Sequence, residues 1–486
     1  MRLEDIIRDG GTIETRGDLG IGIGSICNDS RKVTPGALFI AVKGHGSDGH
    51  AFIGKAVEAG AVAVVYEYGE VPEGVTAVKV ADSRHALAIM AANFYDHPSR
   101  KLNLVGITGT NGKTTTVTLL HDLFMSLGYN CGLLSTIANY VGTRRTETAN
   151  TTSDPITINS LLDEMVDAGC EYCFMEVSSI GVEQKRVEGL DFKVGIFSNL
   201  THDHLDYHGT FAEYLRCKKL FFDSLPASAT AIINIDDKHG EVMVQNTKAR
   251  VLRYSCRTMA DHTCRIIEES FEGMLLRIDG REAWTRLIGR HNAYNILAIY
   301  STAMALGASP DETLVAISTL DSAKGRLEVM RGPKGISVVI DYAHTPDALE
   351  NVLSTLRDID RGKELICLFG CGGDRDRTKR PEMAKVAEEY SDRIFVTSDN
   401  SRTERTEDIM EDIRGGFSPK GLAKAMFIAD RKEAIRTAIM LAPQGTTILL
   451  AGKGHETYQI LGTEKRHFDE REIVSEVFKT METIER

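Results

Sequence analysis

Apolar and polar residues follow one another along this chain in two distinct patterns. Short apolar runs bounded by polar or glycine-rich turns predict buried strands, whereas apolar residues spaced three or four positions apart predict helices that bury one face. Between residues 336 and 451 the two patterns alternate closely, and the strand-like runs are ISVVI, ELICLF, RIFVT, AMFIA and TILLA. Strands that alternate with amphipathic helices are typical of parallel sheets covered by helices, so we predict an α/β protein.

The same patterns divide the chain into three parts. Residues 1–98 combine the strand-like runs ALFIAV and AVAVVYE with turn signals, and a helical pattern closes this part at Pro98. From residue 102 an apolar strand, a glycine-rich turn and a long helix follow one another. A chain of 486 residues has room for about three domains of ~150 residues. We predict a small N-terminal α/β domain at 1–98, a central domain with a parallel or mixed sheet at 99–325 and a C-terminal α/β domain at 326–486.

Composition and charge narrow the class of protein. Charged residues make up 26% and hydrophobic residues 42%, which is the balance of a globular chain rather than a disordered one. The formal net charge of -12 argues against nucleic acid or an anionic membrane as partner, so an anionic substrate would need particular Lys and Arg side chains. The sequence has no apolar run of the ~20 residues that span a bilayer, no signal-peptide pattern and no paired cysteine framework. We therefore expect a cytoplasmic protein.

A glycine-rich loop predicts a phosphate site. The apolar run 102–108 leads into GTNGKTT, and Val117, Leu120 and Phe124 then recur at helical spacing. Backbone N–H groups at the start of a helix attract anions, and the helix dipole adds to this attraction. We expect Lys113 to reach the terminal phosphates and the Thr114 hydroxyl to hold magnesium. The loop is shorter than in the usual G-x-x-x-x-G-K-[ST] pattern, because position 107 is isoleucine and the glycine stands at 109.

Acidic residues and histidines follow the next two strands. Glu176 ends the strand YCFMEV, where an acid commonly holds magnesium beside a phosphate loop, although a solvated loop acid would look the same. After the strand VGIFSNL, residues 201–208 contain three histidines and two aspartates. This group fits a metal or substrate site and a polar loop equally well.

Lys218 occupies an unusual position on a predicted helix. If residues 211–225 are helical, Lys218 shares one face with Tyr214, Phe221 and Phe222. One interpretation is a lysine that extends its ammonium to water along apolar surface. The other is a desolvated lysine with a lowered pKa, whose neutral amine could take up carbon dioxide as a magnesium-binding carbamate. The sequence leaves both open.

Motifs spread along the whole chain resemble those of one enzyme family. The central runs are TGTNGKTT, MEVSS, SNLTHDHLDYHG and GRHNAYNILAIY. They resemble the Mur ligases, which build the peptide of bacterial cell-wall precursors. The N-terminal run NDSRKVTPGALFIAVKGHGSDGH and the C-terminal runs DYAHTPDAL, GCGGDRD, SDNSRTE and AGKGHETYQ are similar to MurE-type members. The resemblance implies an N-terminal domain that binds a uridine diphosphate sugar, a central ATP-binding domain of the P-loop class and a Rossmann-like C-terminal domain.

The resemblance also implies an activity and a set of substrates. It implies an ATP-dependent ligase that joins a carboxylate to an amine through an acyl phosphate, with Mg²⁺ as cofactor. The small-molecule partners implied are ATP, UDP-N-acetylmuramoyl dipeptide and meso-diaminopimelate, and we expect a monomer without membrane insertion.

Particular residues match the motifs of that family. Catalytic roles fall to Lys113, Glu176, Arg186, His204 and Lys218. Metal ligands would be Thr114, Glu176, His204 and a carbamylated Lys218. ATP would be bound by Gly109, Thr110, Asn111, Gly112, Lys113, Thr114, Thr115, Asn292, Asn295, Arg326, Asp341 and His344, the last three from the far side of the cleft. The sugar nucleotide and its peptide would be bound by Asn28, Ser30, His45, Gly46, Ser47, Asn150, Thr151, Thr152, Ser178, Gln184 and Arg186.

The identity of the amine rests on a loop in the last domain. Family members that add diaminopimelate carry Asn-x-Arg there, and this chain has Asn400-Ser401-Arg402. A guanidinium matches the extra carboxylate of diaminopimelate, which lysine lacks. By composition alone Arg402 would be a surface arginine in a charge-rich run, and the motif favours the pocket. The implied pocket consists of Arg375, Asp399, Asn400, Ser401, Arg402, Gly452 and Glu456, with Glu456 facing the distal ammonium.

Two positions depart from the family pattern, and other functions compete. Ile180 stands where family members often have histidine, and Ser401 where proline is usual. The alternatives are the same ligation with L-lysine, a folylpolyglutamate synthase-like ligase, a non-catalytic nucleotide switch, and an oxidoreductase. The last rests only on the weak glycine run 370–373.

Overall fold

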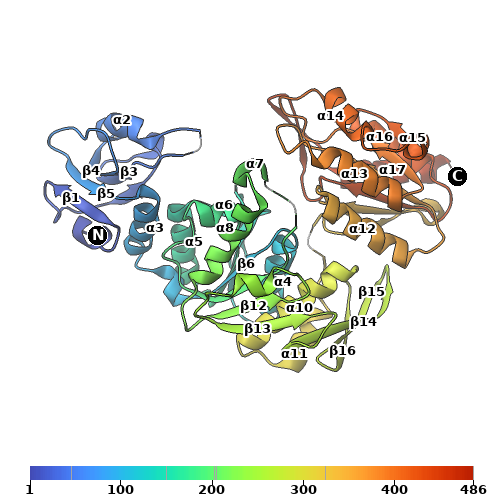
Figure 1. Ribbon diagram of the computed structural model, residues 1–486, viewed down its shortest axis with the longest axis horizontal. Helices are drawn as coiled ribbons and strands as arrows, with labels where there is room; N and C mark the ends of the chain where they lie inside the picture. Colours follow the sequence, from blue (N-terminus) through green and yellow to red (C-terminus); the bar gives the residue numbers. More distant parts are fainter. Residues whose placement is uncertain (45, 149, 202, 204, 323, 485–486) are drawn as a thin grey trace.

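The computed structural model describes residues 1–44, 46–148, 150–201, 203, 205–322 and 324–484. Separate sheets in the N-terminal, central and C-terminal parts follow one another along the long axis of the molecule (Figure 1). The parts with parallel strands are flanked by helices, so the predicted α/β class is confirmed. None of the helices in the described ranges is long and apolar enough to cross a membrane.

The N-terminal sheet has the strand order β1-β5-β4-β3-β2, with β1 antiparallel and the others parallel. Strand β3 is buried along its whole length, which explains why the sequence shows a continuous apolar run there. The strands are β1 Thr12–Arg16, β2 Ser25–Cys27, β3 Ala37–Ile40, β4 Ala61–Tyr66 and β5 Thr76–Val80. The helices are α1 Leu3–Ile6, α2 Ile53–Glu58 and α3 Ser83–Phe94, with short 3-10 turns at Ser30–Lys32, Gly49–Phe52 and Pro98–Lys101.

The central sheet has the order β16-β15-β14-β13-β12-β11-β6-β10-β7-β8-β9. Its middle, from β14 to β7, is parallel, and antiparallel strands extend it at both edges. The strands are β6 Asn103–Thr108, β7 Cys131–Leu134, β8 Asn139–Val141, β9 Arg144–Thr146, β10 Tyr172–Glu176, β11 Phe192–Phe197, β12 Thr230–Asn234, β13 Arg250–Ser255, β14 His262–Ser270, β15 Gly273–Ile278 and β16 Arg281–Thr285.

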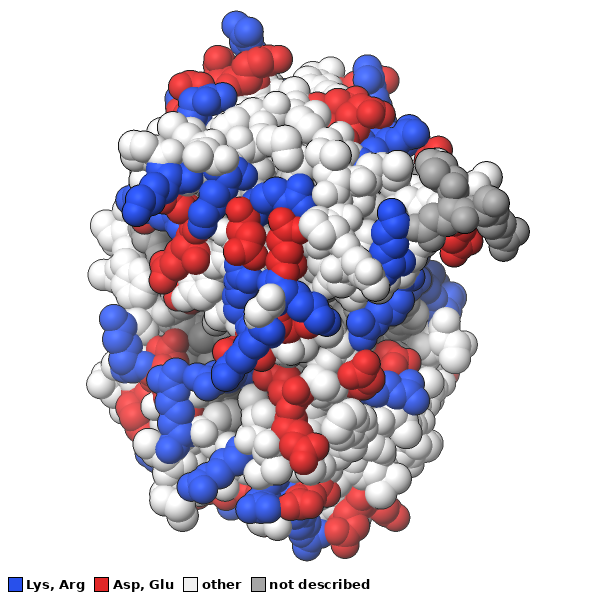
Figure 2. All heavy atoms as spheres, turned by 90° about the vertical axis from the view of Figure 1, so that its right-hand side faces the viewer, with Lys and Arg blue, Asp and Glu red and all other residues white. Residues whose placement is uncertain are grey.

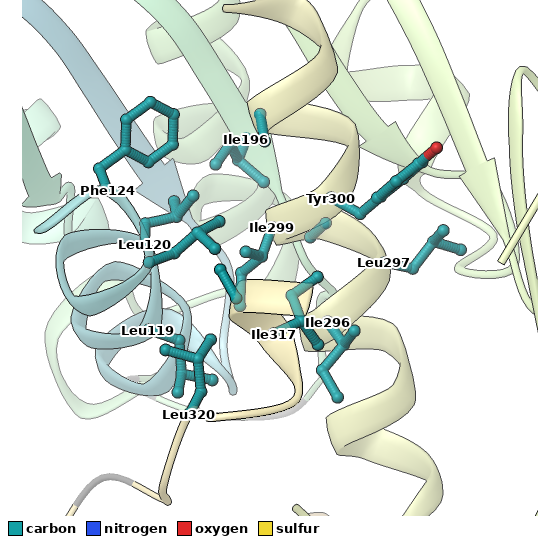
Figure 3. Packing of buried hydrophobic residues seen from close by; sticks show 14 of the residues in the cluster. Leu119, Leu120, Phe124, Ile196, Ile296, Leu297, Ile299, Tyr300, Ile317 and Leu320 are labelled. Atoms are coloured by element: carbon teal, nitrogen blue, oxygen red, sulfur yellow. The ribbon is translucent and has the colours of Figure 1, made fainter. Parts of the chain in front are cut away.

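Helices cover both faces of the central sheet. On one face α4 packs beside α10, where Leu120 and Phe124 of α4 lie close to Ile196 of the sheet and Ile299 of α10 (Figure 3). This contact fixes α4, whose first turn forms part of the phosphate loop. The helices are α4 Lys113–Ser126, α5 Pro155–Asp167, α6 Ser179–Glu183, α7 Leu205–His208, α8 Phe211–Asp223, α9 Gly240–Met243, α10 Arg290–Ala305 and α11 Pro310–Ile317.

The C-terminal sheet has the order β17-β18-β22-β19-β20-β21, parallel except for β17. Its strands are β17 Glu328–Arg331, β18 Ser337–Asp341, β19 Leu365–Phe369, β20 Arg393–Val396, β21 Ala425–Phe427 and β22 Thr447–Ala451, and a hairpin of β23 Tyr458–Leu461 and β24 Glu464–His467 follows. Its helices are α12 Pro346–Ile359, α13 Lys379–Tyr390, α14 Thr406–Arg414, α15 Pro419–Lys424, α16 Arg431–Met440 and α17 Glu470–Ile484, with a 3-10 turn at Pro333–Gly335. On the face at this end of the molecule, acidic and basic side chains are intermixed (Figure 2).

The five strands predicted between 336 and 451 all exist, with ends shifted by a residue or two. The antiparallel strands β14, β15 and β16 were not predicted. The carboxyl ends of β6, β10 and β11 lie at one edge of the sheet, because these neighbouring strands are parallel. In open α/β sheets ligands bind at that edge, and the residues described next lie there.

Candidate active site

The glycine-rich loop joins β6 to α4 and is held by the end of β11. The N–H groups of Thr110 and Asn111 donate to the main-chain and side-chain oxygens of Asn199, both at 2.9 Å. Gly112 caps α4 with a φ of 87°, and a Cβ at this position would lie 2.6 Å from Asn295 Oδ1. Glycine is therefore required here by the left-handed backbone and by the close approach of Asn295. The N-terminus of α4 is left facing a cavity, as an anion site requires.

Two lysines converge on one carbonyl oxygen of this loop. Lys113 Nζ donates to the carbonyl oxygens of Gly109 and Thr110, both at 2.9 Å. Lys218 Nζ, from α8, donates to the same Gly109 oxygen at 2.7 Å and lies 4.7 Å from the centre of the Tyr214 ring. The geometry therefore places two basic groups side by side.

Burial changes the chemistry of Lys218. The residue is 1% exposed and shares its buried helix face with Tyr214, Phe221 and Phe222, so the predicted position inside an apolar face is confirmed. Helix α8 ends at Asp223, two residues before the predicted end. Burial lowers the pKa of Lys218 well below its ordinary value, and the neighbouring Lys113 lowers it further. The interpretation as a lysine reaching water is wrong, and a neutral amine is favoured.

Glu176 presents an unpaired oxygen to the same region. It is the last residue of β10 and 1% exposed, and its Oε1 accepts the N–H of Thr136 at 2.7 Å. Its buried Oε2 has no hydrogen-bond partner among the described residues. A buried carboxylate oxygen without a partner is costly unless a cation or ligand completes it. Together with the Thr114 hydroxyl and Asp203 on the same cavity, it provides the oxygen donors that Mg²⁺ prefers.

Three of the four predicted metal ligands, Thr114, Glu176 and Lys218, belong to the described residues. His204 lies outside the described residues. Within the described ranges, no group of three or more His, Cys, Asp or Glu side chains could hold a metal ion alone. Hydroxyl, phosphate or modified-lysine oxygens would have to complete the coordination of a cation.

A first cavity of about 260 Å³ lies between the central and C-terminal domains. On one side Asn295 Nδ2 donates to Asn292 Oδ1 at 3.0 Å. On the other side Asp341 accepts the N–H groups of Leu327 and Ala343, both at 2.7 Å, and burial raises its pKa. The predicted ATP residues that line this cavity are Asn111, Gly112, Thr115, Asn292, Asn295, Arg326 and Asp341.

A second cavity of about 270 Å³ adjoins the first. His344 was predicted to bind ATP, but it lines this second cavity, together with Lys113 and Lys218, and not the first. Burial lowers the pKa of His344 to about 4, and positive Lys379 lowers it further. Gly109 does not line either cavity, because the two lysines cover its carbonyl. The predicted residues on this cavity are Thr110, Asn111, Gly112, Lys113, Thr114, Asn150, Thr151, Thr152, Glu176, Ser178, Arg186, Lys218, Arg326 and His344.

A third cavity of about 730 Å³ lies between the N-terminal and central domains. The guanidinium of Arg186 is fixed at its edge by donating to Thr152 O at 2.6 Å and to Gln184 Oε1 at 2.7 Å. Gly46 is not among the lining residues, and His45 lies outside the described residues. The predicted residues that do line it are Asn28, Ser30, Ser47, Asn150, Gln184 and Arg186.

The cavities are linked by shared walls. Arg326 and Asn111 line both the first and the second, and Asn150 and Arg186 line both the second and the third. A ligand in the first cavity and one in the third would therefore meet in the second, beside Lys113.

The loop after β20 carries the predicted amino-acid pocket. Arg402 has a left-handed backbone with φ 50°, and its Nη1 donates to Gly373 O at 2.7 Å. A Cβ on Gly372 would lie 3.0 Å from Arg402 Nη1 and 3.8 Å from Arg375 Cγ, so these two arginines flank Gly372. Within the part of the chain that the structure describes, neither arginine forms an ion pair. Both guanidinium groups can therefore receive a carboxylate.

On the other side of this pocket, Glu456 is hydrogen-bonded to neighbouring side chains of the protein. Glu456 Oε2 accepts from Asn400 Nδ2 and from Lys453 Nζ, both at 2.9 Å. Glu456 was expected to face a ligand ammonium, and the structure shows that one of its oxygens is occupied by Lys453. Gly452 has φ 113°, and a Cβ there would lie 3.2 Å from Asp399 Oδ2. Asp399, Asn400 and Ser401, which precede Arg402 in the same loop, are buried.

Models of three domains of one family match this chain. "Mur ligase family, catalytic domain" matches residues 22–95, "Mur ligase middle domain" matches residues 107–303, and "Mur ligase, glutamate ligase domain" matches residues 325–454. The chain belongs to the Mur ligase family.

Similar proteins match over nearly the full length of this Mur ligase. The UDP-N-acetylmuramoyl-L-alanyl-D-glutamate--2,6-diaminopimelate ligase of Cytophaga hutchinsonii is 49% identical over 99% of this chain and 100% of its own. The protein of the same name from Phocaeicola vulgatus is 50% identical over 98% and 99%. A solved structure of a ligase of that name is 30% identical, covers 99% of each chain and has a TM-score of 0.72.

Some site residues of this Mur ligase were not predicted. Asp347, at the start of α12, accepts Asn111 Nδ2 at 2.8 Å and joins the phosphate loop to the C-terminal domain. No sequence signal links residues so far apart. The third cavity also has basic residues that the sequence analysis passed over, although the run NDSRK already contains two of them: Arg31, Lys32, Lys43, Lys55 and Arg84.

Proposed function

We propose that this Mur ligase uses ATP to join meso-diaminopimelate to UDP-N-acetylmuramoyl-L-alanyl-D-glutamate, a step in making peptidoglycan precursors. The observation that carries the proposal is the second cavity, which shares walls with both neighbouring cavities. It would bring the terminal phosphate of a nucleotide and the carboxylate of an acceptor together beside Lys113. The full-length similarity to diaminopimelate ligases supports the choice of substrates.

The proposed reaction has two steps. A side-chain carboxylate oxygen of the acceptor attacks the γ-phosphorus, the bond to the ADP oxygen breaks, and an acyl phosphate forms. The amine of diaminopimelate then attacks the acyl carbon, loses a proton, and expels phosphate. Lys113 would neutralise charge on the transferring group, and Arg186, fixed by Thr152 and Gln184, would orient the acceptor carboxylate.

Magnesium fits the residues of the second cavity. Thr114, Glu176, His204 and a modified Lys218 would hold it, and the buried unpaired Oε2 of Glu176 supports this choice. When bound, the ion would neutralise phosphate charge. The chain itself would contribute Lys113 and the N–H groups at the start of α4.

We infer that Lys218 is carbamylated in the active enzyme. Its neutral Nζ would attack carbon dioxide, form an N–C bond and release one proton to water, which leaves an anion. The conversion would replace a repulsive pair of basic groups at Gly109 by an attractive one. Intact mass measured at neutral pH should show the mass of one added CO₂, and the addition should disappear on acidification.

The choice of diaminopimelate over L-lysine rests on Arg402 and Arg375. Their guanidinium groups form no ion pair within the described residues and could bind the second carboxylate bidentately. L-lysine would leave them unpaired, which favours rejection. A folylpolyglutamate synthase-like activity is disfavoured because the family match includes the N-terminal residues 22–95.

The domain division and the cellular setting complete the proposal. The separate sheets support a sugar-nucleotide domain at 1–98, an ATP domain at 99–325 and an amino-acid domain at 326–486. We propose a cytoplasmic monomer, which size-exclusion chromatography with light scattering would test.

A phosphate-release assay tests the function directly. Purified protein, ATP, Mg²⁺ and the nucleotide-sugar dipeptide should release phosphate with meso-diaminopimelate and much more slowly with L-lysine. Mass spectrometry should find the tripeptide. Phosphate release that does not depend on any amine, or a preference for lysine, would contradict the proposal.

A further inference from the structure

Lys453 lies immediately after Gly452, at the end of β22, and is fully buried. Its Nζ donates to Glu456 Oε2 at 2.9 Å, to Asn400 Oδ1 at 3.1 Å and to Asp399 Oδ1 at 3.2 Å. An ammonium has three N–H donors, and all three are used. Lys453 therefore cannot bind a substrate itself, and any effect it has must act through these three side chains.

The acceptors of Lys453 are also joined to one another. Asn400 Nδ2 donates to the same Glu456 oxygen at 2.9 Å, and the N–H of Asn400 donates to Asp399 Oδ1 at 2.8 Å. The N–H of Ile460 reaches Asn400 Oδ1 at 2.9 Å. Oε2 of Glu456 is thus held by two donors, while its Oε1 accepts no hydrogen bond from the described residues. One oxygen of Glu456 remains for a ligand.

The net charge around the remaining oxygen of Glu456 follows from the charges of its neighbours. Burial opposes ionisation of Asp399, but Lys453 and Arg431 outweigh it and hold the pKa of this carboxyl below its usual range. Arg431 is itself neutralised by Glu470 at 2.8 Å, where both side chains are fully buried. Asp399, Glu456 and Lys453 together therefore carry one net negative charge. This matches one ammonium, while the guanidinium groups of Arg375 and Arg402 can both donate hydrogen bonds to one carboxylate.

We propose that Lys453 is a positioning residue for the amine substrate. It cancels the charge of one of two adjacent carboxylates and holds Glu456 and Asn400 in place, so that one net negative charge faces the ammonium of an amino-acid head group. This inference rests on the proposed amino-acid pocket and adds to it the residue that sets its charge and shape. The chemistry recognised is a zwitterionic head group, with Glu456 at the ammonium and the two arginines at the carboxylate.

Substitutions that remove and then restore the charge balance test this role. The Lys453→Met variant leaves two carboxylates without a shared cation, and Lys453→Met/Asp399→Asn removes their repulsion. In the full-length enzyme, Lys453→Met should raise KM for diaminopimelate by about tenfold or more, because both carboxylates lose a charged hydrogen bond. KM for ATP and kcat at saturating diaminopimelate should change by less than about threefold. The double variant should have a lower KM for diaminopimelate than either Lys453→Met or Asp399→Asn.

The split between KM and kcat separates positioning from loss of structure. A purely structural role would lower the active fraction, and hence kcat, without a selective change in KM. The matched control is Lys385→Met, an exposed lysine of α13 paired with Glu382, which should behave as the wild type. Thermal melting shows whether Lys453→Met folds. If it does not, KM for diaminopimelate is compared between Asp399→Asn and the double variant, and the double variant should have the lower KM.

The proposal is overturned if KM for diaminopimelate is unchanged in Lys453→Met, if KM for all substrates rises together, or if the double variant is no better than the single ones. A failure of the proposed function would look different, because wild-type protein would then release no phosphate in the presence of diaminopimelate.

Discussion

Lys113 and Lys218 donate to the same oxygen atom, the carbonyl of Gly109, at 2.9 and 2.7 Å. One lysine comes from the phosphate loop and the other from α8, a helix about one hundred residues further along the chain. Two ammonium groups this close repel each other, and burial lowers the pKa of each. The pair therefore favours one charged and one neutral amine.

Replacing Lys218 should separate activity from stability. Lys218→Met keeps the apolar packing of α8 and removes a desolvated amine, so the melting temperature should stay the same or rise. Activity should fall by about 100-fold or more, the usual cost of losing a group that stabilises charge at the reacting centre. The control is Lys219→Met, which loses only the pair with Asp223 and should stay close to wild type. Phosphate release and differential scanning fluorimetry measure both quantities, and an active Lys218→Met enzyme would remove Lys218 from the mechanism.

Glu176 should set the magnesium requirement. The substitution Glu176→Gln removes a buried negative charge whose Oε2 has no partner in the described structure, so folding should be unaffected or improved. The Mg²⁺ concentration for half-maximal activity should rise by about tenfold or more, because losing even a group that only orients the metal ligands typically costs about 10- to 100-fold in affinity. Calorimetric titration of Mg²⁺ into the protein with ADP gives a second readout. Glu171→Gln, at the exposed residue immediately before the same strand, serves as the control. An unchanged magnesium dependence in Glu176→Gln would argue against a metal at this carboxylate.

Arg402 should affect one substrate selectively. Because its guanidinium forms no ion pair within the described residues, Arg402→Ala should leave the fold intact and remove the partner of the second carboxylate. KM for diaminopimelate should rise by about 100-fold, as expected for a lost bidentate charged contact, while KM for ATP stays within about twofold. Nearby Arg405→Ala, whose exposed side chain pairs only loosely with Glu407 at 3.8 Å, should change neither value. Equal effects on both substrates would defeat the pocket assignment.

Much of this site could be predicted because its signals are local. The strand, loop and first turn of α4 lie within one short stretch, and Lys218 reveals its burial through the spacing of its own helix. Strand β14 escaped prediction because exposed and half-buried positions dominate it and do not alternate cleanly.

Lys453 could not be predicted because two of its three partners come from another strand. Asp399 and Asn400 follow β20, whereas Lys453 follows β22, and β19 lies between these two strands in the sheet. Only the parallel order of the sheet brings the two loops to the same edge. The sequence gives no signal for a contact of this kind, which depends on strand order rather than on spacing.

Acidic pH should lower the free energy of unfolding through protonation of buried His291. The pKa of His291 is lowered to about 4 by burial and by positive Arg326, against an unfolded value of about 6.5. Between these values the unfolded chain binds more protons, so the stability that neutral His291 provides is present above pH 6.5 and is lost as the pH falls toward 4. The expected loss is about 1 kcal/mol per pH unit.

Thermal melting from pH 7 to pH 5 checks this. The melting temperature of His291→Asn should fall less than that of the wild type. The exposed His467, whose pKa is raised by Glu472, is the control, and His467→Asn should not reduce the loss. Identical slopes for His291→Asn and wild type would show that folding does not lower the pKa of His291.

The buried pair of Arg431 and Glu470 should dominate the stability of the C-terminal domain. Arg431 also donates to Ser398 O at 3.1 Å and to Ala451 O at 2.8 Å, and thereby ties together the ends of β20 and β22 that form the amino-acid pocket. Arg431→Met would leave Glu470 buried without a partner, at a cost of about 3–5 kcal/mol. We expect a lower melting temperature that Arg431→Met/Glu470→Gln partly restores, because the double variant removes the unpaired charge. Lys432→Met, which breaks only the exposed pair with Glu476 at 3.1 Å, should cost less than about 1 kcal/mol. If Arg431→Met and Lys432→Met have the same melting temperature, the buried pair of Arg431 and Glu470 does not contribute the stability expected of it.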